Sequence, residues 1–238
     1  MNLSGAMDYD ELEHALRDGS AAHVPREAVA GILGEIASGH RELRAVRHPL
    51  GFLCLPVVRD GERGVCVHLF GGGSAAGEPA AAGMHAHSWE LLSHVLYGHV
   101  SNVPVRVTEP ASAPAPGPAA GPSPGATHRV FEVHSAPDGT DELRPTERLV
   151  RSEPGPEHTS TGGETYTLAA GEFHSTVVRN GEPAATLVLG RTLPGRRDLF
   201  LGPVHGPARR TVRRLCGAED TRRTVRAALR RVHAGHRE

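Results

Sequence analysis

The sequence predicts an all-β domain that carries helices at both ends. Roughly ten short apolar segments, each bounded by turn residues, recur between residues 46 and 204. Gly and Pro are numerous, at 29 and 19 residues, and they favour turns and short strands over long helices. Helical periodicity is found in residues 8–44 and again in residues 207–235. Together these observations fit an all-β barrel or a double-sheet jelly roll, in which closure protects the sheet edges.

The first part of the chain, residues 1–45, is expected to be a helical extension of the β domain. Pro25 suits the first turn of a second helix, so one or two helices are expected there. Their apolar faces must be buried, and the outside of the barrel is the simplest partner. The apolar positions at helical spacing are Leu12, Ala15, Leu16, Val29, Ile32, Leu33 and Ile36.

The β domain, residues 46–204, is expected to begin with a hairpin. Residues 51–58 and 64–70 are apolar runs that flank a turn. The Gly-rich connector 71–83 lacks the GK[ST] signature of a phosphate-binding loop. The Pro/Ala-rich stretch 109–127 cannot bury apolar surface, so we expect a disordered loop inserted between strands. Further strands are expected within 84–98, 99–109, 128–135, 146–152, 164–168, 173–179 and 185–191.

Charge is distributed unevenly along the chain. The formal net charge is −1, and all 26 basic residues are Arg, which is typical of a GC-rich bacterial genome. The last part, residues 205–238, is expected to be a basic helical tail, because ten Arg and three acidic residues follow from Pro207 onward. Such a tail could contact nucleic acid or a membrane. An Arg-rich solvated helix face is favoured instead, since aromatic residues and nucleic-acid-binding motifs are absent from the tail sequence.

The sequence favours a cytoplasmic protein without a membrane span. No run approaches the 18 or so apolar residues of a transmembrane helix. The N-terminal segment is acidic and periodic, unlike a signal peptide. Three widely spaced cysteines include no CxxC pair. Cys54 and Cys66 lie in apolar runs and are expected to be buried free thiols.

Three histidines form the candidate metal site. His85 and His87 are two residues apart, so on a strand both imidazoles point to the same face. Two ligands hold a metal weakly, and His174 is the best third ligand because a Gly-led turn there enters another strand. Imidazole ligands suit iron, zinc, copper or nickel. A solvated His pair is the alternative, because the chain contains 16 His.

Two short motifs carry a family resemblance. The segment HAHSWELLSHVLYG resembles the first cupin motif, in which His-x-His is followed at a set distance by Gly. The segment AAGEFH resembles the second, Pro-x-Gly-x-x-His, with Ala169 in place of Pro. The resemblance covers roughly residues 46–204 and implies a cupin double-stranded β-helix. It also implies that His85, His87 and His174 hold the metal.

The ligand set resembles one branch of the cupins, the three-histidine thiol dioxygenases. Many cupins add a Glu ligand seven residues before the motif Gly, but here that position is Leu91. The adjacent Glu90 would face the opposite side of a strand and could ligate only through a bulge. The stretches LLSHVLYG and NGEPAATLVLG are also similar to thiol dioxygenase segments. This resemblance implies Fe(II), dioxygen and a thiol substrate, with Zn or Ni as other possible metals.

The residues that assist chemistry in cysteine dioxygenases do not carry over. Their relay His and Tyr align with Val188 and the neighbourhood of Gly190. The expected early strand offers no carboxylate-binding Arg before Arg59, at its turn. Catalytic residues other than the metal ligands are therefore unassigned. The candidate substrate-binding residues are Arg106, Arg191 and Tyr97, because a guanidinium can hold a carboxylate bidentately and a tyrosine could line the cavity.

The leading functional prediction is a mononuclear iron dioxygenase that acts on a small substrate, for which a thiol is one candidate. A zinc or nickel cupin with isomerase, lyase or condensation chemistry is the first alternative, because three His and a water also form a catalytic zinc site. A cupin ligand sensor, whose basic tail contacts a partner, is the second. Homodimerisation is compatible with the resemblance, since cupins often pair through sheet edges.

Overall fold

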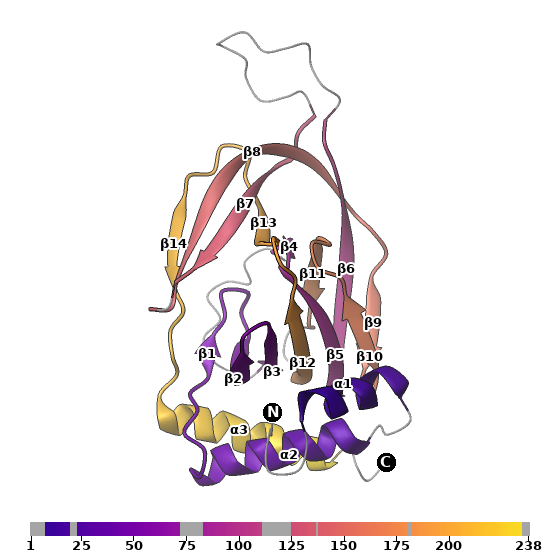
Figure 1. The fold of residues 1–238 in the computed structure, drawn as a ribbon, viewed down its shortest axis with the longest axis vertical. Helices are drawn as coiled ribbons and strands as arrows, with labels where there is room; N and C mark the ends of the chain where they lie inside the picture. The colour runs from indigo at the N-terminus through magenta and orange to yellow at the C-terminus, as the bar shows by residue number, and fades with distance from the viewer. Residues whose placement is uncertain are drawn as a thin grey trace.

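The computed structural model describes residues 8–19, 23–71, 83–110, 125–136, 138–179 and 182–234. The described chain is mostly β, as the sequence predicts, and it forms two antiparallel sheets with three helices on one side (Figure 1). The predicted connector 71–83 and loop 109–127 fall for the most part outside the described residues. The helices are α1 (Tyr9–Asp18), α2 (His23–Ser38) and α3 (Ala218–Ala234).

Six strands form the sheet that lies next to the helices, in the order β1-β2-β3-β12-β5-β10. The second sheet has eight strands, in the order β14-β8-β7-β13-β4-β11-β6-β9. Members of the first sheet are β1 (Val46–Arg47), β2 (Leu53–Asp60), β3 (Arg63–Phe70), β5 (Trp89–Tyr97), β10 (Thr165–Leu168) and β12 (Ala184–Thr192). Members of the second are β4 (His85–Ala86), β6 (His99–Thr108), β7 (His128–Ser135), β8 (Thr140–Pro154), β9 (His158–Thr161), β11 (His174–Val177), β13 (Asp198–Gly202) and β14 (Arg209–Val212).

The main apolar core lies between the three helices and the outer face of the six-stranded sheet. Leu12, Ile32 and Val225, one from each helix, pack there with strand residues such as Leu55 and Leu187. The predicted packing of the N-terminal helices on the outside of the β domain is therefore confirmed. We call the sheet face toward the helices the outer face and the opposite one the inner face.

Local sequence defines the ends of α1. Asp8 is the N-cap, and its carboxylate accepts a hydrogen bond from the Glu11 N–H while the Glu11 side chain bonds back to the Asp8 N–H. Gly19 ends the helix in the left-handed conformation, with φ of 67°. Because both ends are capped, the short helix can present Leu12 and Leu16 to the core on one side.

The hairpin of β2 and β3 contains a β-bulge that the sequence does not announce. Its turn is shorter than predicted, because pairing continues to Asp60 opposite Arg63. The register shifts between Pro56 and Val58. A one-residue shift reverses the face to which the following side chains point. Arg59 therefore lies on the inner face of the sheet, opposite its cross-strand partner Gly64.

The basic tail differs from the prediction in its first half. Residues 209–212 form β14, which pairs with β8, and the helix begins only at Ala218. Val212 and Leu215, which were expected on an apolar helix stripe, are more than half exposed. Backbone pairing with β8 wins over helix propensity here because it satisfies the N–H and C=O groups of the sheet edge. In α3 itself, Val225, Ala228 and Val232 are buried in the helix-side core. One face of this helix is thus apolar, which agrees with the predicted solvated face that carries the Arg residues.

The two sheets contact each other through their inner faces. Val95 and Ala184 from the six-stranded sheet share an apolar cluster with Val100 of β6 in the eight-stranded sheet. Among the described helices, none combines the length and apolar character needed to cross a membrane.

Candidate metal centre

His85, His87 and His174 meet on the eight-stranded sheet, as the sequence predicts. Strands β4 and β11 pair so that His85 and His174 lie directly opposite each other. His87 follows two residues after His85, which returns its side chain to the same face. The N–H of Gly171, in the turn before His174, donates to the His87 carbonyl at 2.8 Å and joins the two motifs.

The three imidazoles, which we call the histidine cluster, are close enough to share one ion. One potential ligand nitrogen of each lies within 4.8 Å of the others. The ring centroids are 4.4 Å apart for His85 and His174, 4.8 Å for His85 and His87, and 5.2 Å for His87 and His174. The spacing leaves room for a cation between the rings without direct hydrogen bonds among them.

Backbone carbonyls orient two of these rings. Nδ1 of His85 lies 2.7 Å from the Gly83 carbonyl, and Nδ1 of His174 lies 3.2 Å from the Glu172 carbonyl. A carbonyl can only accept, so each Nδ1 carries the proton and donates it. The Nε2 atoms then keep free lone pairs. This outer hydrogen bond is the arrangement that fixes the tautomer of metal-binding histidines.

The protonation state of the cluster also suits a metal. Burial lowers the pKa of His85, and it lowers that of His174 to about 4. The pKa of His87 falls well below its ordinary value because of burial and of the neighbouring imidazoles, first His85 and then His174. All three rings are neutral at pH 7 and are therefore competent ligands. The histidine cluster could hold a metal ion.

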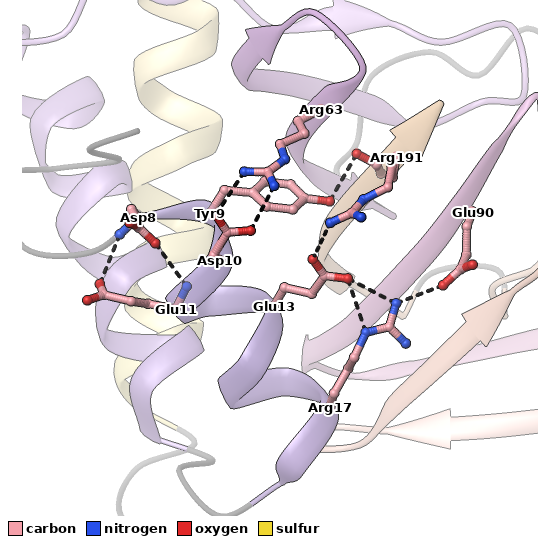
Figure 2. Close-up of polar contacts among 10 residues, drawn as sticks. Asp8, Tyr9, Asp10, Glu11, Glu13, Arg17, Arg63, Glu90 and Arg191 are labelled. Atoms are coloured by element: carbon pink, nitrogen blue, oxygen red, sulfur yellow. Dashed lines mark hydrogen bonds and ion pairs between the residues drawn. The ribbon is translucent and has the colours of Figure 1, made fainter. Parts of the chain in front are cut away.

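Among the residues that the structure describes, no carboxylate joins the histidine cluster. Leu91, at the position where many cupins carry Glu, belongs to an apolar cluster with Cys54, Cys66 and Val188 on the inner face. Glu90 faces the other way, and its carboxylate accepts a hydrogen bond of 2.7 Å from Arg17 of α1 (Figure 2). Strand alternation thus separates the two residues as expected, and Glu90 is engaged on the outer face.

The structure places the three predicted substrate-binding residues away from the histidine cluster. Arg191 of β12 pairs with Glu13 of α1 at 3.0 Å on the outer face (Figure 2). Arg106 of β6 is largely exposed and pairs with Glu153. Tyr97 packs against the helix-side core, because a register shift in the β5–β12 pairing falls just before it. Because the three side chains lie apart from one another and from the histidine cluster, the predicted substrate-binding role is wrong for this set.

Two residues near the histidine cluster were missed by sequence reasoning. Trp89, to which the sequence analysis assigned no role, begins β5, and its ring centroid lies 6.1 Å from that of His87. Arg59 was set aside as a turn residue, but its guanidinium carbon lies 5.2 Å from the Trp89 ring centroid. The bulge before Arg59 decides its direction, and no sequence signal marks that bulge.

Two glycines make room for the Trp89 ring. A Cβ on Gly190 would lie 2.0 Å from Cε3 of Trp89, and one on Gly64 would lie 3.4 Å from Cζ3. The ring therefore occupies the space that a side chain at position 190 of β12 would need, and it lies in ordinary contact distance of Gly64 in β3. The place where a relay Tyr was sought by alignment, Gly190, is covered by this indole.

Comparisons with known proteins add no family assignment. No protein-family model matches the chain, and a search of curated proteins finds no matching relative.

Proposed function

We propose that the protein is a mononuclear non-haem iron enzyme that uses dioxygen to oxidise a small substrate, with a thiol as the first candidate. The observation that carries the proposal is the histidine cluster, with three neutral imidazoles and apolar Leu91 where a carboxylate ligand would lie. An all-histidine ligand set resembles that of the thiol dioxygenase branch of the cupins. The two antiparallel sheets are compatible with a cupin barrel.

The protein contributes three imidazole nitrogens, in fixed positions, as metal ligands. Ferrous iron, when bound, would contribute redox chemistry with dioxygen and affinity for sulfur. The Nε2 atoms of His85 and His174 are aimed by their Nδ1 bonds to Gly83 and Glu172. His87 completes the set. The ligands themselves add no charge, so a bound cation keeps its full positive charge for an anionic substrate.

Residues beside the cluster suit an anionic substrate. The Trp89 ring lies edge-on to that of His87, with ring centroids 6.1 Å apart, and supports the Arg59 guanidinium by a cation–π contact. Arg59 is exposed, and a guanidinium binds a carboxylate through two parallel hydrogen bonds. We assign Arg59 the role of binding the acidic group of the substrate, with the thiol sulfur directed toward the metal.

The test combines metal analysis with oxygen consumption. Protein purified without a metal-affinity tag is expected to bind one Fe(II) at the histidine cluster and to consume oxygen with aminothiols or mercaptocarboxylates. His174→Ala should abolish both, because two imidazoles hold iron weakly. Arg59→Gln should keep the iron and raise the KM for acidic thiols at least tenfold, while leaving uncharged thiols little affected.

A non-redox zinc enzyme is the second candidate, because three oriented neutral imidazoles also form a catalytic zinc site. Tightly held zinc, with no oxygen uptake from any thiol after iron loading, would favour this candidate and contradict the first.

A further inference from the structure

A second group of metal-binding side chains lies on the six-stranded sheet. Cys54 of β2, Cys66 of β3 and His68 of β3 bring two thiol sulfurs and an imidazole nitrogen within 4.8 Å of one another. We call these three residues the cysteine cluster. Both thiols are free and buried, with Cys54 8% and Cys66 1% exposed. They face the inner-face apolar cluster of Leu91 and Val188.

The backbone builds this group by the same rule as the histidine cluster. Cys54 and His68 are direct cross-strand partners in the β2–β3 pairing, and Cys66 precedes His68 by two residues. In the histidine cluster, His85 and His174 are the cross-strand partners and His87 lies two residues from His85. An i, i+2 pair plus the residue opposite places three side chains on one face of two paired strands.

A positive charge lies beside one of the two thiols, that of Cys66. The Arg59 guanidinium donates a hydrogen bond to Cys66 Sγ at 3.5 Å. Thiolates are the form that binds metals, and a nearby cation offsets the charge of two of them. Phe52 holds the His68 ring, with centroids 4.6 Å apart. Arg59 and Phe52 thus contact two of the three donors, Cys66 and His68.

We propose that Cys54, Cys66 and His68 form a second metal site, selective for a thiophilic cation such as Zn²⁺. Two thiolates and one imidazole leave one tetrahedral position for water or another ligand, a donor set that zinc accepts. Sulfur donors discriminate against the harder ferrous ion that suits the histidine cluster. This site and the proposed function both involve Arg59, but they share no metal ligand, so the second site does not depend on whether iron binds at His85, His87 and His174.

Cobalt substitution tests the proposal directly, because sulfur-to-cobalt charge-transfer absorption reports only thiolate ligation. Reduced, metal-stripped protein with three titratable thiols is expected to bind two equivalents of Co²⁺ and to show this absorption. Cys54→Ser and Cys66→Ser should each lose one equivalent and the absorption. His174→Ala should lose the other equivalent and keep the absorption, so the two sites are read separately.

Cys216→Ser is the matched control, because Cys216 is equally buried but lies in the core on the helix side. It should keep both equivalents and the full absorption. Circular dichroism establishes that each variant is folded, and His68→Gln replaces any serine variant that is not. The proposal would be overturned if reduced wild-type protein showed no sulfur-to-cobalt absorption. It would also be overturned if folded Cys54→Ser kept the absorption, or if His68→Gln kept both the absorption and an unchanged Co²⁺ affinity.

Discussion

At the scale of single residues, strand alternation explains most of what the side chains do. His94 shows what strand alternation predicts correctly and what it does not predict. Alternation predicts that His94 faces away from the interior of the β domain, and in the structure it lies on the outer face next to Leu92 and Leu96. It is only 2% exposed, however, because the helices cover that face. Thr165 bonds its Nδ1 at 3.0 Å, and its buried Nε2 has no partner among the described residues.

This environment predicts an acid-sensitive fold. Burial, and secondarily the charge of Arg26, lowers the pKa of His94 from 6.5 to about 4. The unfolded chain therefore binds a proton more readily, and stability falls as the pH drops from 6.5 toward 4. At about 1.4 kcal/mol per pKa unit, the loss at pH 4 is about 3 kcal/mol. His94→Leu should remove that part of the acid dependence.

Urea unfolding at pH 7 and at pH 4.5 measures the effect as the difference between the two stabilities. Exposed His99, replaced by Gln, is the control and should retain the wild-type difference. An equal acid dependence in wild type and His94→Leu would show that His94 is not the group responsible.

At the scale of elements, α1 is attached to the six-stranded sheet by one buried hydrogen bond and a surrounding set of ion pairs (Figure 2). The Tyr9 hydroxyl donates to the Gly190 carbonyl at 3.1 Å, and the Tyr9 side chain is nearly fully buried. Arg63 lies over the Tyr9 ring, 4.9 Å from its centroid. The ion pairs of Glu13 with Arg17 and Arg191 surround this contact, and their exposure limits each to a small contribution.

Tyr9 substitutions should separate the hydrogen bond from the packing of the ring. Tyr9→Phe removes only the hydroxyl and is expected to cost about 1 kcal/mol of unfolding free energy. Tyr9→Ala also leaves a cavity and should cost about 3–4 kcal/mol. Denaturant unfolding gives both values, and limited proteolysis reports release of α1. Equal losses for the two variants would contradict the assignment of most of the energy to ring packing.

The sequence predicts these elements better than it predicts their partners. The capped, periodic segment around Leu12 is recognisable as a helix, and the apolar runs around Val67 and Leu187 are recognisable as strands. Helix propensity fails at residues 209–212, where pairing with β8 decides the structure. The bulge between Pro56 and Val58 also has no local signature, so the direction of Arg59 could not be predicted.

At the scale of the whole molecule, a buried ion pair holds the C-terminal segment to the eight-stranded sheet. Asp141 of β8 is 5% exposed, and Arg213, just after β14, binds both of its carboxylate oxygens. Ser135 of β7 donates to the same carboxylate at 2.6 Å. This contact joins β7, β8 and the chain that leads to α3, so it couples the sheet edge to the helix side.

Breaking that pair should destabilise the fold as a whole. Asp141→Asn leaves Arg213 without its charge partner in a half-buried position and is expected to cost about 3 kcal/mol of unfolding free energy. Glu142→Gln is the matched control, because the neighbouring Glu142–Arg144 pair is more exposed and should contribute at most about 1 kcal/mol. Thermal and urea unfolding measure both variants, and similar losses would show that burial of the Asp141 pair is not decisive.

The sequence by itself determined the β-rich class, the helices at both ends and the three histidines of the candidate metal centre. It could do so because helical and strand periodicities, turn residues and His-x-His spacing are local properties. Apart from the meeting of His174 with His85 and His87, which the two short motifs predicted, tertiary structure alone decided which distant residues meet. Strand pairing placed Cys54 opposite His68, the bulge turned Arg59 toward Trp89, and docking of α1 brought Glu13 to Arg191 on the outer face. These outcomes depend on register, where a shift of one residue exchanges the two faces of a strand.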